Sequence, residues 1–385
     1  MKNKMKIEQN RTIIDFFSGA GGFTLGALRA GFNVVGALEI DDLAMDTHAR
    51  NFPVIKHCKI DLSKISPQQL RKSFMLKQGE LCGIIGGPPC QGFSSIGHRN
   101  IHDDRNNLFV RFFEFVREFR PTFFIAENVL GILTDKFKNI LEESFNKLPR
   151  SYTILAYQIV KANEYGAPTT RSRAFFIGYD SKRMNPLAEE DFLKAKVPEA
   201  KRICVQDALI GLPEDISLLH NGVGQISVSW KDVIQNNRCS DFYKRIYSMV
   251  PKYVGDKNIL GRYRSQNMVS GCIPTKHSCD VINRYSELKY GQRDKISKSV
   301  KLDPEGFCPT LRSGTGPDKG SFQAVRPIHF NNPRVITPRE AARLQGFPDW
   351  FDFQPTIWHS FRQIGNSVSP IVAERILSII RHKLT

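Results

Sequence analysis

The feature that most constrains the fold of this 385-residue chain is an alternation of short apolar runs with amphipathic stretches, from Thr12 to about residue 178. This alternation is typical of βα units that build a mostly parallel sheet. Strands are expected at 12–16, 33–38, 81–85, 122–126, 151–160 and 174–177. Apolar residues at helical spacing predict helices at 23–30, 108–119 and 137–147. The expected fold class is α/β, a mixed sheet with helices on both faces.

The pattern changes after residue 178. Residues from about 180 to 330 are rich in Asn, Ser, Lys and Gly, and their apolar runs are short and irregular, which indicates an inserted, loop-rich unit. Order returns from Arg334, with helices expected at 337–344 and 370–381. We therefore expect one catalytic and cofactor-binding domain at 1–190 and 360–385, a smaller domain at 191–333, a hinge region at 334–359, and a cleft between the two domains.

The charge of the chain points to a polyanionic partner. Lys and Arg number 55 against 38 Asp and Glu, a formal charge of +17, which favours nucleic acid. Residues 231–301 contain 15 basic and 6 acidic side chains, interleaved with tyrosines. Basic residues mixed with aromatic rings suit a surface that follows phosphates and stacks on bases. The alternative is a solvated basic surface without such a partner.

The cysteines and the apolar segments exclude several classes of protein. Eight cysteines occur without a Cys-x-x-Cys pair, which argues against a zinc module or a disulfide framework, so no metal site is expected. The basic start at 1–6 is not followed by an apolar signal stretch before Arg11, and no window approaches transmembrane length. We expect a cytoplasmic protein with no membrane contact, in which Cys90 remains a reduced thiol.

A cofactor site is predicted from the first expected strand onward. The turn SGAGG at 18–22 follows that strand and precedes a helix, as in the first βα turn of nucleotide-binding sheets. Glu39 ends the next strand, where a carboxylate can accept hydrogen bonds from both ribose hydroxyls. Asp61 follows a strand-like region at 54–60 and could meet an adenine amino group. Carboxylates without a phosphate-binding lysine favour S-adenosylmethionine, which has a cationic sulfonium and no phosphate, over NAD or ATP.

The chemical half of the site is predicted from two other segments. An apolar run ends in GGPPCQGFS at 86–94, which holds the Cys90 thiol on a stiff turn at the end of a strand. Glu127 follows a second apolar run. A thiolate that adds to carbon 6 of cytosine and a carboxyl at ring N3 would make carbon 5 nucleophilic. Arg171 and Arg173 alternate along an extended stretch, so they could hold the base or its phosphate, or position Glu127; a plain surface pair is the alternative.

These segments together resemble the DNA cytosine-5 methyltransferases of bacterial restriction-modification systems, whose motifs the chain matches in order. The matching segments are DFFSGAGGF at 15–23, GPPCQGFS at 87–94, ENV at 127–129, the arginines at 171 and 173, RVITPREAARLQGFP at 334–348 and GNSV at 365–368. The resemblance implies a Rossmann-like methyltransferase domain that uses S-adenosylmethionine. It also implies that 191–333 is the target-recognition domain and that the target cytosine is flipped out of duplex DNA.

The resemblance also assigns roles to individual residues. The catalytic residues would be Cys90, Glu127, Arg171 and Arg173. The cofactor would be held by Phe17, Gly19, Gly21, Gly22, Glu39, Ile40, Asp61, Leu62, Pro89, Asn366 and Ser367. Contacts to DNA would come from Gln91, Ser94, Arg105, Thr310 and Leu311. One position departs from the family pattern, because Thr169 stands where the family usually has Gln.

Two other functions remain as alternatives. The first is methylation of cytosine in tRNA, but that branch usually has Cys-Phe-Thr in its target region and Thr after the nucleophile-loop Phe, where this chain has Ser94. The second is a non-catalytic DNA-binding regulator on the same fold, which would be expected to lose Cys90, Glu127 or the glycine loop. The expected partners are double-stranded DNA and, from family habit, a cognate restriction endonuclease. A monomer is expected, since an enzyme that flips one base needs no symmetry.

Overall fold

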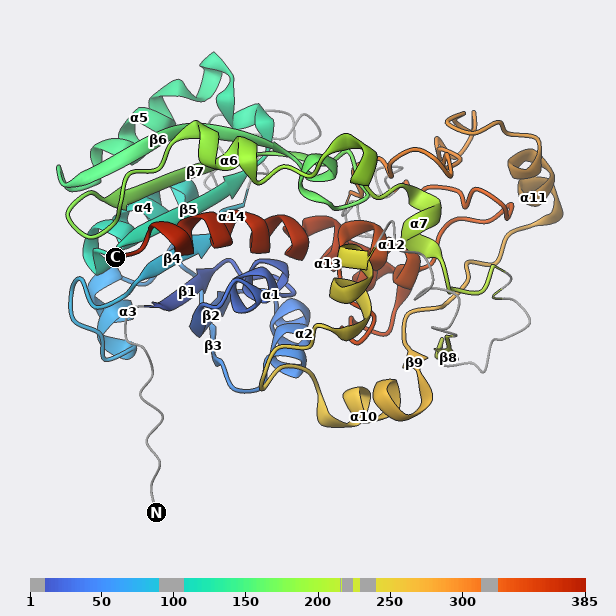
Figure 1. The fold of residues 1–385 in the computed structure, drawn as a ribbon, viewed down its shortest axis with the longest axis horizontal. Coiled ribbons are helices and arrows are strands. Elements are labelled where there is room, and N and C mark those ends of the chain that lie inside the picture. Colours follow the sequence, from blue (N-terminus) through green and yellow to red (C-terminus); the bar gives the residue numbers. More distant parts are fainter. Residues whose placement is uncertain (1–10, 90–106, 215, 217–223, 229–239, 313–324) are drawn as a thin grey trace.

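The protein is described from a computed structural model, and the described residues are 11–89, 107–214, 216, 224–228, 240–312 and 325–385. A seven-stranded sheet fills one half of the molecule (Figure 1). Its order is β3-β2-β1-β4-β5-β7-β6, and all neighbours are parallel except the pairs that β7 forms with β5 and β6. The strands are β1 (Thr12–Phe16), β2 (Asn33–Glu39), β3 (Lys56–Lys59), β4 (Gly83–Gly86), β5 (Phe123–Asn128), β6 (Tyr152–Lys161) and β7 (Ser172–Asp180).

Helices cover both faces of this sheet, as the sequence predicted. Successive residues of a strand point to opposite faces, and accordingly Ile13 belongs to one buried cluster and Ile14 to the other. The helices of the first part of the chain are α1 (Gly22–Arg29), α2 (Asp42–Asn51), α3 (Pro67–Ser73), α4 (Asn107–Phe119), α5 (Lys138–Asn146) and α6 (Glu189–Lys194). Each predicted strand and helix of the sheet half is present, with ends within three residues of the prediction. Helices α2, α3 and α6 were not predicted.

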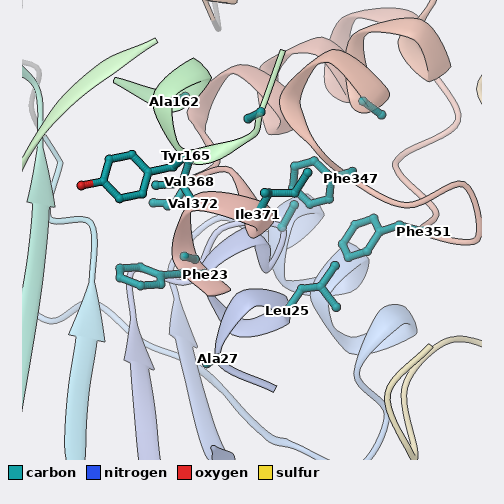
Figure 2. Close-up of a cluster of buried hydrophobic side chains, with 14 of the residues drawn as sticks. Phe23, Leu25, Ala27, Ala162, Tyr165, Phe347, Phe351, Val368, Ile371 and Val372 are labelled. Carbon is teal, nitrogen blue, oxygen red and sulfur yellow. The ribbon is translucent and has the colours of Figure 1, made fainter. Parts of the chain in front are cut away.

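The last helix of the chain, α14 (Pro370–Lys383), packs on the first, α1. The two helices come very close, because a Cβ on Gly26 would stand 2.3 Å from the Cβ of Ala373. Apolar side chains from both helices meet there with Phe347 and Phe351 (Figure 2). The N-terminal and C-terminal segments of the sheet domain therefore share one hydrophobic core.

The inserted segment lies at the other end of the molecule (Figure 1). Its described elements are short: α7 (Val205–Leu209), β8 (Ile226–Ser227), α9 (Ser240–Tyr243), α10 (Lys257–Gln266), β9 (Met268–Val269) and α11 (Cys279–Ser286). Strands β8 and β9 form a separate antiparallel pair. The predicted boundary at residue 190 is not marked by a break in packing, because Asp191 in α6 forms a 2.8 Å ion pair with Lys383 in α14.

Two helices join the insertion to the sheet domain. These are α12 (Pro338–Gln345), predicted at 337–344, and α13 (Ile357–Asn366), which was not predicted. Thr337 caps α12 by accepting a hydrogen bond from the backbone N–H of Glu340, whose carboxylate in turn accepts from the N–H of Thr337. All eight residues of α12 are buried, including Arg339, Glu340 and Arg343. Helix α12 contacts α7 on one side and α13 on the other.

Candidate active site

The turn between β1 and α1 has a backbone that requires glycine at particular points. Phe17, Gly19 and Gly21 have positive φ angles of 57°, 53° and 100°. Of these three, Phe17 has a side chain, so its backbone conformation is strained. Gly22 has a different constraint, because a Cβ there would stand 2.2 Å from the carbonyl oxygen of Val368. The glycine loop and the closing GNSV segment are therefore in direct contact.

A cavity of about 450 Å³ opens where these two segments meet. It brings together the ends of β1, β2 and β5 with the segment after β4 and the end of α13. Most of the predicted cofactor residues line it: Phe17, Gly19, Gly22, Glu39, Ile40, Asp61, Leu62, Pro89, Asn366 and Ser367. Residues that are hundreds of positions apart in the chain thus share one site, at the carboxyl ends of parallel strands.

Backbone N–H groups hold the Glu39 carboxylate in the cavity wall. Its Oε2 accepts from Gly19 at 2.9 Å, and its Oε1 accepts from Ile40 at 2.8 Å and Asp41 at 3.0 Å. The side chain of Ile40 is 58% exposed beside it. Because these three donors fix the carboxylate, its remaining lone pairs have a defined direction, which suits recognition of a pair of hydroxyl groups.

Asp61 is fixed in a similar way on the next segment of the wall. The Ser63 hydroxyl donates to its Oδ1 at 2.6 Å, and the N–H of Ser63 donates to the same oxygen at 3.0 Å. The hydrogen bond from the Ser63 side chain lowers the pKa of Asp61. Asp61 is therefore an acceptor at neutral pH, as recognition of an amino group requires.

Asp15 is a further acid of this cavity, and the sequence had indicated it only as part of the glycine-loop motif. Its side chain is 1% exposed, and its Oδ2 accepts a 2.6 Å hydrogen bond from Thr24. Its Oδ1 has no hydrogen-bond partner among the described residues. Burial raises the pKa of Asp15 to about 7, despite the hydrogen bond from Thr24, which lowers it.

Glu127 lies at the opposite end of the cavity, where β5 ends. Its Oε1 is 3.0 Å from Nε of Arg173 and 4.0 Å from an Nη of Arg171. Arg171 also donates to the carbonyl oxygen of Gly365 at 2.7 Å, next to the closing motif. The expectation that both arginines point to one face is confirmed, and of the roles left open for them the structure shows contact with Glu127.

The turn at Gly87–Pro89 lies beside this carboxyl group. A Cβ on Gly87 would stand 3.5 Å from Oε2 of Glu127, so the second carboxylate oxygen faces the turn. Pro88 and Pro89 line the cavity, and Asn128 donates to the carbonyl oxygen of Pro88 at 3.4 Å. The predicted residues Cys90, Gln91, Ser94 and Arg105 lie outside the described residues, and Cys90 follows Pro89 directly in the chain.

Three predicted residues do not line the cavity. Gly21 lies against α2, since a Cβ there would stand 2.3 Å from the ring of Phe52, so it shapes the turn and not the cofactor wall. Leu311 is 3% exposed within the main hydrophobic cluster. The segment before Thr310 is joined to the start of β7, because Thr170 donates its N–H to the carbonyl oxygen of Cys308 at 2.9 Å. Leu311 is therefore a core residue of the inserted segment.

Helix α13 contributes cavity residues that the sequence analysis missed. His359, Arg362 and Gln363 line the cavity, and Arg362 forms a 3.0 Å ion pair with Asp41. A signal for this helix was present, because Thr356 caps it and apolar residues recur three and four positions apart within it.

The described residues contain neither a metal-binding cluster nor a helix suited to span a membrane. Within 11–89, 107–214, 216, 224–228, 240–312 and 325–385, no group of three or more His, Cys, Asp or Glu side chains could hold a metal ion. Over the same ranges, none of the helices combines the length and the apolar character needed to cross a bilayer.

Comparisons with known proteins agree with this geometry. The family model for C-5 cytosine-specific DNA methylases matches residues 11–382. The Type II methyltransferase M.XorII of Xanthomonas oryzae pv. oryzae is 34% identical over 94% of this chain and 82% of its own length. The Type II methyltransferase M.DdeI of Desulfomicrobium norvegicum is 33% identical over 94% of this chain and 87% of its own length. A crystal structure of a candidate DNA modification methyltransferase encoded within an E. coli prophage is 44% identical, with a TM-score of 0.83 over 97% of this chain and 99% of that one. The protein therefore belongs to the C-5 cytosine-specific DNA methylase family.

Proposed function

We propose that this methyltransferase takes a cytosine flipped out of duplex DNA and methylates its carbon 5 with S-adenosylmethionine as the methyl donor. The observation that carries the proposal is the position of Glu127. Its carboxyl group is held by Arg173 on one oxygen and faces the Gly87–Pro89 turn with the other. A proton donor for a pyrimidine ring and the turn that precedes a thiol thus meet in one cavity.

The other end of the cavity fits the proposed cofactor. Phe17, Ile40 and Leu62 provide aromatic and apolar surface for an adenine ring. Glu39 and Asp61 are fixed acceptors for the ribose hydroxyls and the adenine amine, and Asn366 and Ser367 stand where the methionine end would lie. The unpartnered Oδ1 of Asp15 matches a cationic ligand. When bound, the cofactor supplies a methyl group made electrophilic by its sulfonium.

In the proposed mechanism the chain's own residues activate the base. The Cys90 thiolate adds to carbon 6 of cytosine, while Glu127 donates a proton or hydrogen bond to ring N3, so that the electron pair becomes available at carbon 5. Arg173 holds Glu127 in place through that addition. After carbon 5 has gained the methyl group, loss of its proton restores the ring as the thiolate leaves carbon 6.

A role in restriction-modification follows from the relatives, which are Type II methyltransferases. Methylation by this protein would protect host DNA from a cognate endonuclease that cuts the same target. Double-stranded DNA would bind to the basic, tyrosine-rich insertion. The net charge of +17 on the whole chain would attract the DNA phosphates. We propose that the protein acts as a monomer in the cytoplasm.

The proposal is tested first by Glu127→Gln, which keeps the shape of the side chain and removes its acid. Loss of a general acid lowers the rate by about 10²–10⁴-fold. The measurement is transfer of labelled methyl groups from S-adenosylmethionine to duplex DNA. Glu142→Gln is the matched control, because that side chain is 59% exposed on α5, and it should retain full activity. An active Glu127→Gln variant would remove Glu127 from the mechanism.

The nucleophile is tested on the same assay. Cys90→Ala should abolish transfer and leave DNA binding intact, whereas Cys279→Ala, which changes an exposed thiol, should be fully active. Duplex DNA with 5-fluorocytosine at the target should trap a covalent adduct of the wild type, since fluorine cannot leave as a proton does. Transfer to tRNA in place of DNA would favour the tRNA alternative, and failure on both by folded, cofactor-binding protein would favour the regulator.

A further inference from the structure

A chain of hydrogen bonds runs from the cofactor cavity to the edge of the sheet. Its distances are 2.6 Å between Asp15 Oδ2 and Thr24 Oγ1, 3.0 Å between Thr24 Oγ1 and His48 Nε2, and 2.9 Å between His48 Nδ1 and His57 Nε2. The four residues come from β1, α1, α2 and β3. Asp15, Thr24 and His48 are buried, whereas His57 is partly exposed. The chain thus connects a buried carboxyl group in the cavity with a ring that reaches solvent.

The hydrogen atoms of this chain can point in only two ways. When Asp15 is ionised, the Thr24 hydroxyl donates to it, His48 donates from Nε2 to Thr24, and His57 donates from Nε2 to His48. When Asp15 carries a proton on Oδ2, each group reverses and the chain donates toward His57. Burial lowers the pKa of His48 well below its usual value and also lowers that of His57, which favours the neutral form of both rings in either arrangement.

The environment of Asp15 places its change of ionisation near neutral pH. Burial keeps water from its carboxyl group, and the nearby Glu39 carboxylate adds repulsion, so that its pKa lies at about 7. The other titratable and charged groups that act on the chain or line the cavity nearby are His48, His57, Asp41, Asp61, Glu127, Arg171, Arg173, His359 and Arg362. The arginines among them are held by Glu127 or by Asp41. A cationic ligand would therefore gain the Asp15 counter-charge, in addition to the carboxylates of Glu39 and Asp61 in the same cavity wall, only when the Asp15 carboxyl group is ionised.

We propose that the Asp15–Thr24–His48–His57 chain is a proton relay that couples binding of the cationic cofactor to loss of one proton from the cavity. Thr24, His48 and His57 are positioning residues that act through Asp15. The proposal rests on the proposed function, because it takes S-adenosylmethionine as the ligand. The relay adds one negative charge to the cavity, at Asp15, when the cation is present and removes that charge when the cation is absent.

The proton balance of the relay closes with Asp15 as the one group of the four that changes its charge. The proton on Asp15 Oδ2 passes to Thr24, the Thr24 proton to His48 Nε2, and the His48 Nδ1 proton to His57 Nε2. His57 then releases a proton from Nδ1 to solvent. Asp15 ends as a carboxylate, both histidines end neutral with exchanged tautomers, and one proton has left the protein.

The test is titration calorimetry with S-adenosylmethionine at pH 6, 7 and 8, in two buffers of different ionisation enthalpy. If only the ionised form binds, the ionised fraction rises from about 0.1 to about 0.9 over this range, and affinity rises about tenfold. Near pH 7 the buffer dependence should report release of about half a proton per ligand. Affinity that does not change with pH, together with no proton release, would overturn the relay.

Variants separate the relay from simple packing. Asp15→Asn should bind more weakly, with no proton release and a flat pH profile. Thr24→Val keeps the side-chain shape but removes the donor that lowers the pKa of Asp15, so the rise in affinity should move to higher pH. Thr122→Val, a buried threonine at the far end of β5 from Glu127, should keep the wild-type profile.

The outcomes also separate this proposal from the proposed function. A folded wild type that binds no S-adenosylmethionine at any pH would contradict the proposed function. Normal binding in which Thr24→Val follows the wild-type profile would contradict the relay alone. Because Thr24→Val is close to isosteric, that arm stays informative even if Asp15→Asn fails to fold.

Discussion

Helices α4 and α12 are both buried, but they are held by opposite kinds of interaction. Helix α4 turns an apolar face with five phenylalanines to the sheet, and Phe113 meets Phe124 with ring centroids 5.3 Å apart. Helix α12 is buried on all sides and carries Arg339, Glu340 and Arg343 into the interior. The first region is an ordinary hydrophobic layer, whereas the second is a junction of buried charges.

The charges of α12 are paired and hydrogen-bonded throughout. Arg343 donates to both oxygens of Asp349, at 2.8 and 2.6 Å, and to the carbonyl oxygen of Ile210 at 2.7 Å. Arg339 donates to the carbonyl oxygen of Ser270 at 2.7 Å. These bonds reach into the insertion on two sides, so α12 sets the orientation of the insertion with directional bonds. Apolar contacts, which lack direction, would hold it less specifically.

Arg343→Met is expected to have the largest effect on stability. It leaves Asp349 buried without its bidentate partner and with Arg339 4.0 Å away. This loss costs about 3–5 kcal/mol of the free energy of unfolding, measured by urea denaturation. The double variant Arg343→Met with Asp349→Leu should recover most of this loss, because it removes the stranded charge. Arg264→Met, at an exposed position of α10, should stay within about 0.5 kcal/mol of the wild type. A mild effect of the single variant would show that the junction is not held by its charges.

Thr337→Ala is expected to have an intermediate effect on the same junction. It removes the side-chain cap of α12 and one hydrogen bond to the Glu340 carboxylate, and we expect a loss of about 2 kcal/mol, at the upper end for N-caps because the site is buried. Ser66→Ala removes the equivalent cap of the exposed helix α3 and should cost less in the same denaturation experiment. Equal losses at the two caps would mean that burial adds nothing at α12.

Phe113→Met should have the smallest effect, although this side chain is as buried as Arg343. Exchange of one large apolar group for another of similar volume costs less than about 1.5 kcal/mol, and the flexible Met side chain can fill the space among the neighbouring rings. Phe113→Met and Arg343→Met introduce the same residue, so a difference between their effects reports on the two regions. A loss as large as that of Arg343→Met would show that α4 also depends on specific geometry.

Sequence pattern predicted one of these regions far better than the other. The spacing of apolar residues located α4 and its buried face, because the apolar face of an amphipathic helix is the one that packs against the core. Helix α12 was located by the return of an orderly pattern from Arg334, but its burial was not foreseen, since Arg and Glu residues are mostly exposed in proteins. Only the tertiary partners, Asp349 and Arg334 among them, make these charges tolerable inside.

The active site shows the same limit at the scale of single residues. Motifs located Glu127, Glu39 and Phe17 in the cavity wall, because each stands at the carboxyl end of a strand. They could not distinguish Gly21, which packs under α2, from Gly22, which permits contact with Val368. The Thr24–His48 contact was also out of reach, because it joins two helices through side chains that no motif links.

The contact between Gly22 and Val368 joins two segments that are synthesised at very different times. A ribosome makes the glycine loop early and the GNSV segment only after nearly 350 further residues have been added. Until then one wall of the cavity does not exist, and α1 lacks the helix α14 that shares its hydrophobic core. A chain interrupted before residue 365 would therefore lack both part of the pocket and part of the core, and we expect it to have no activity.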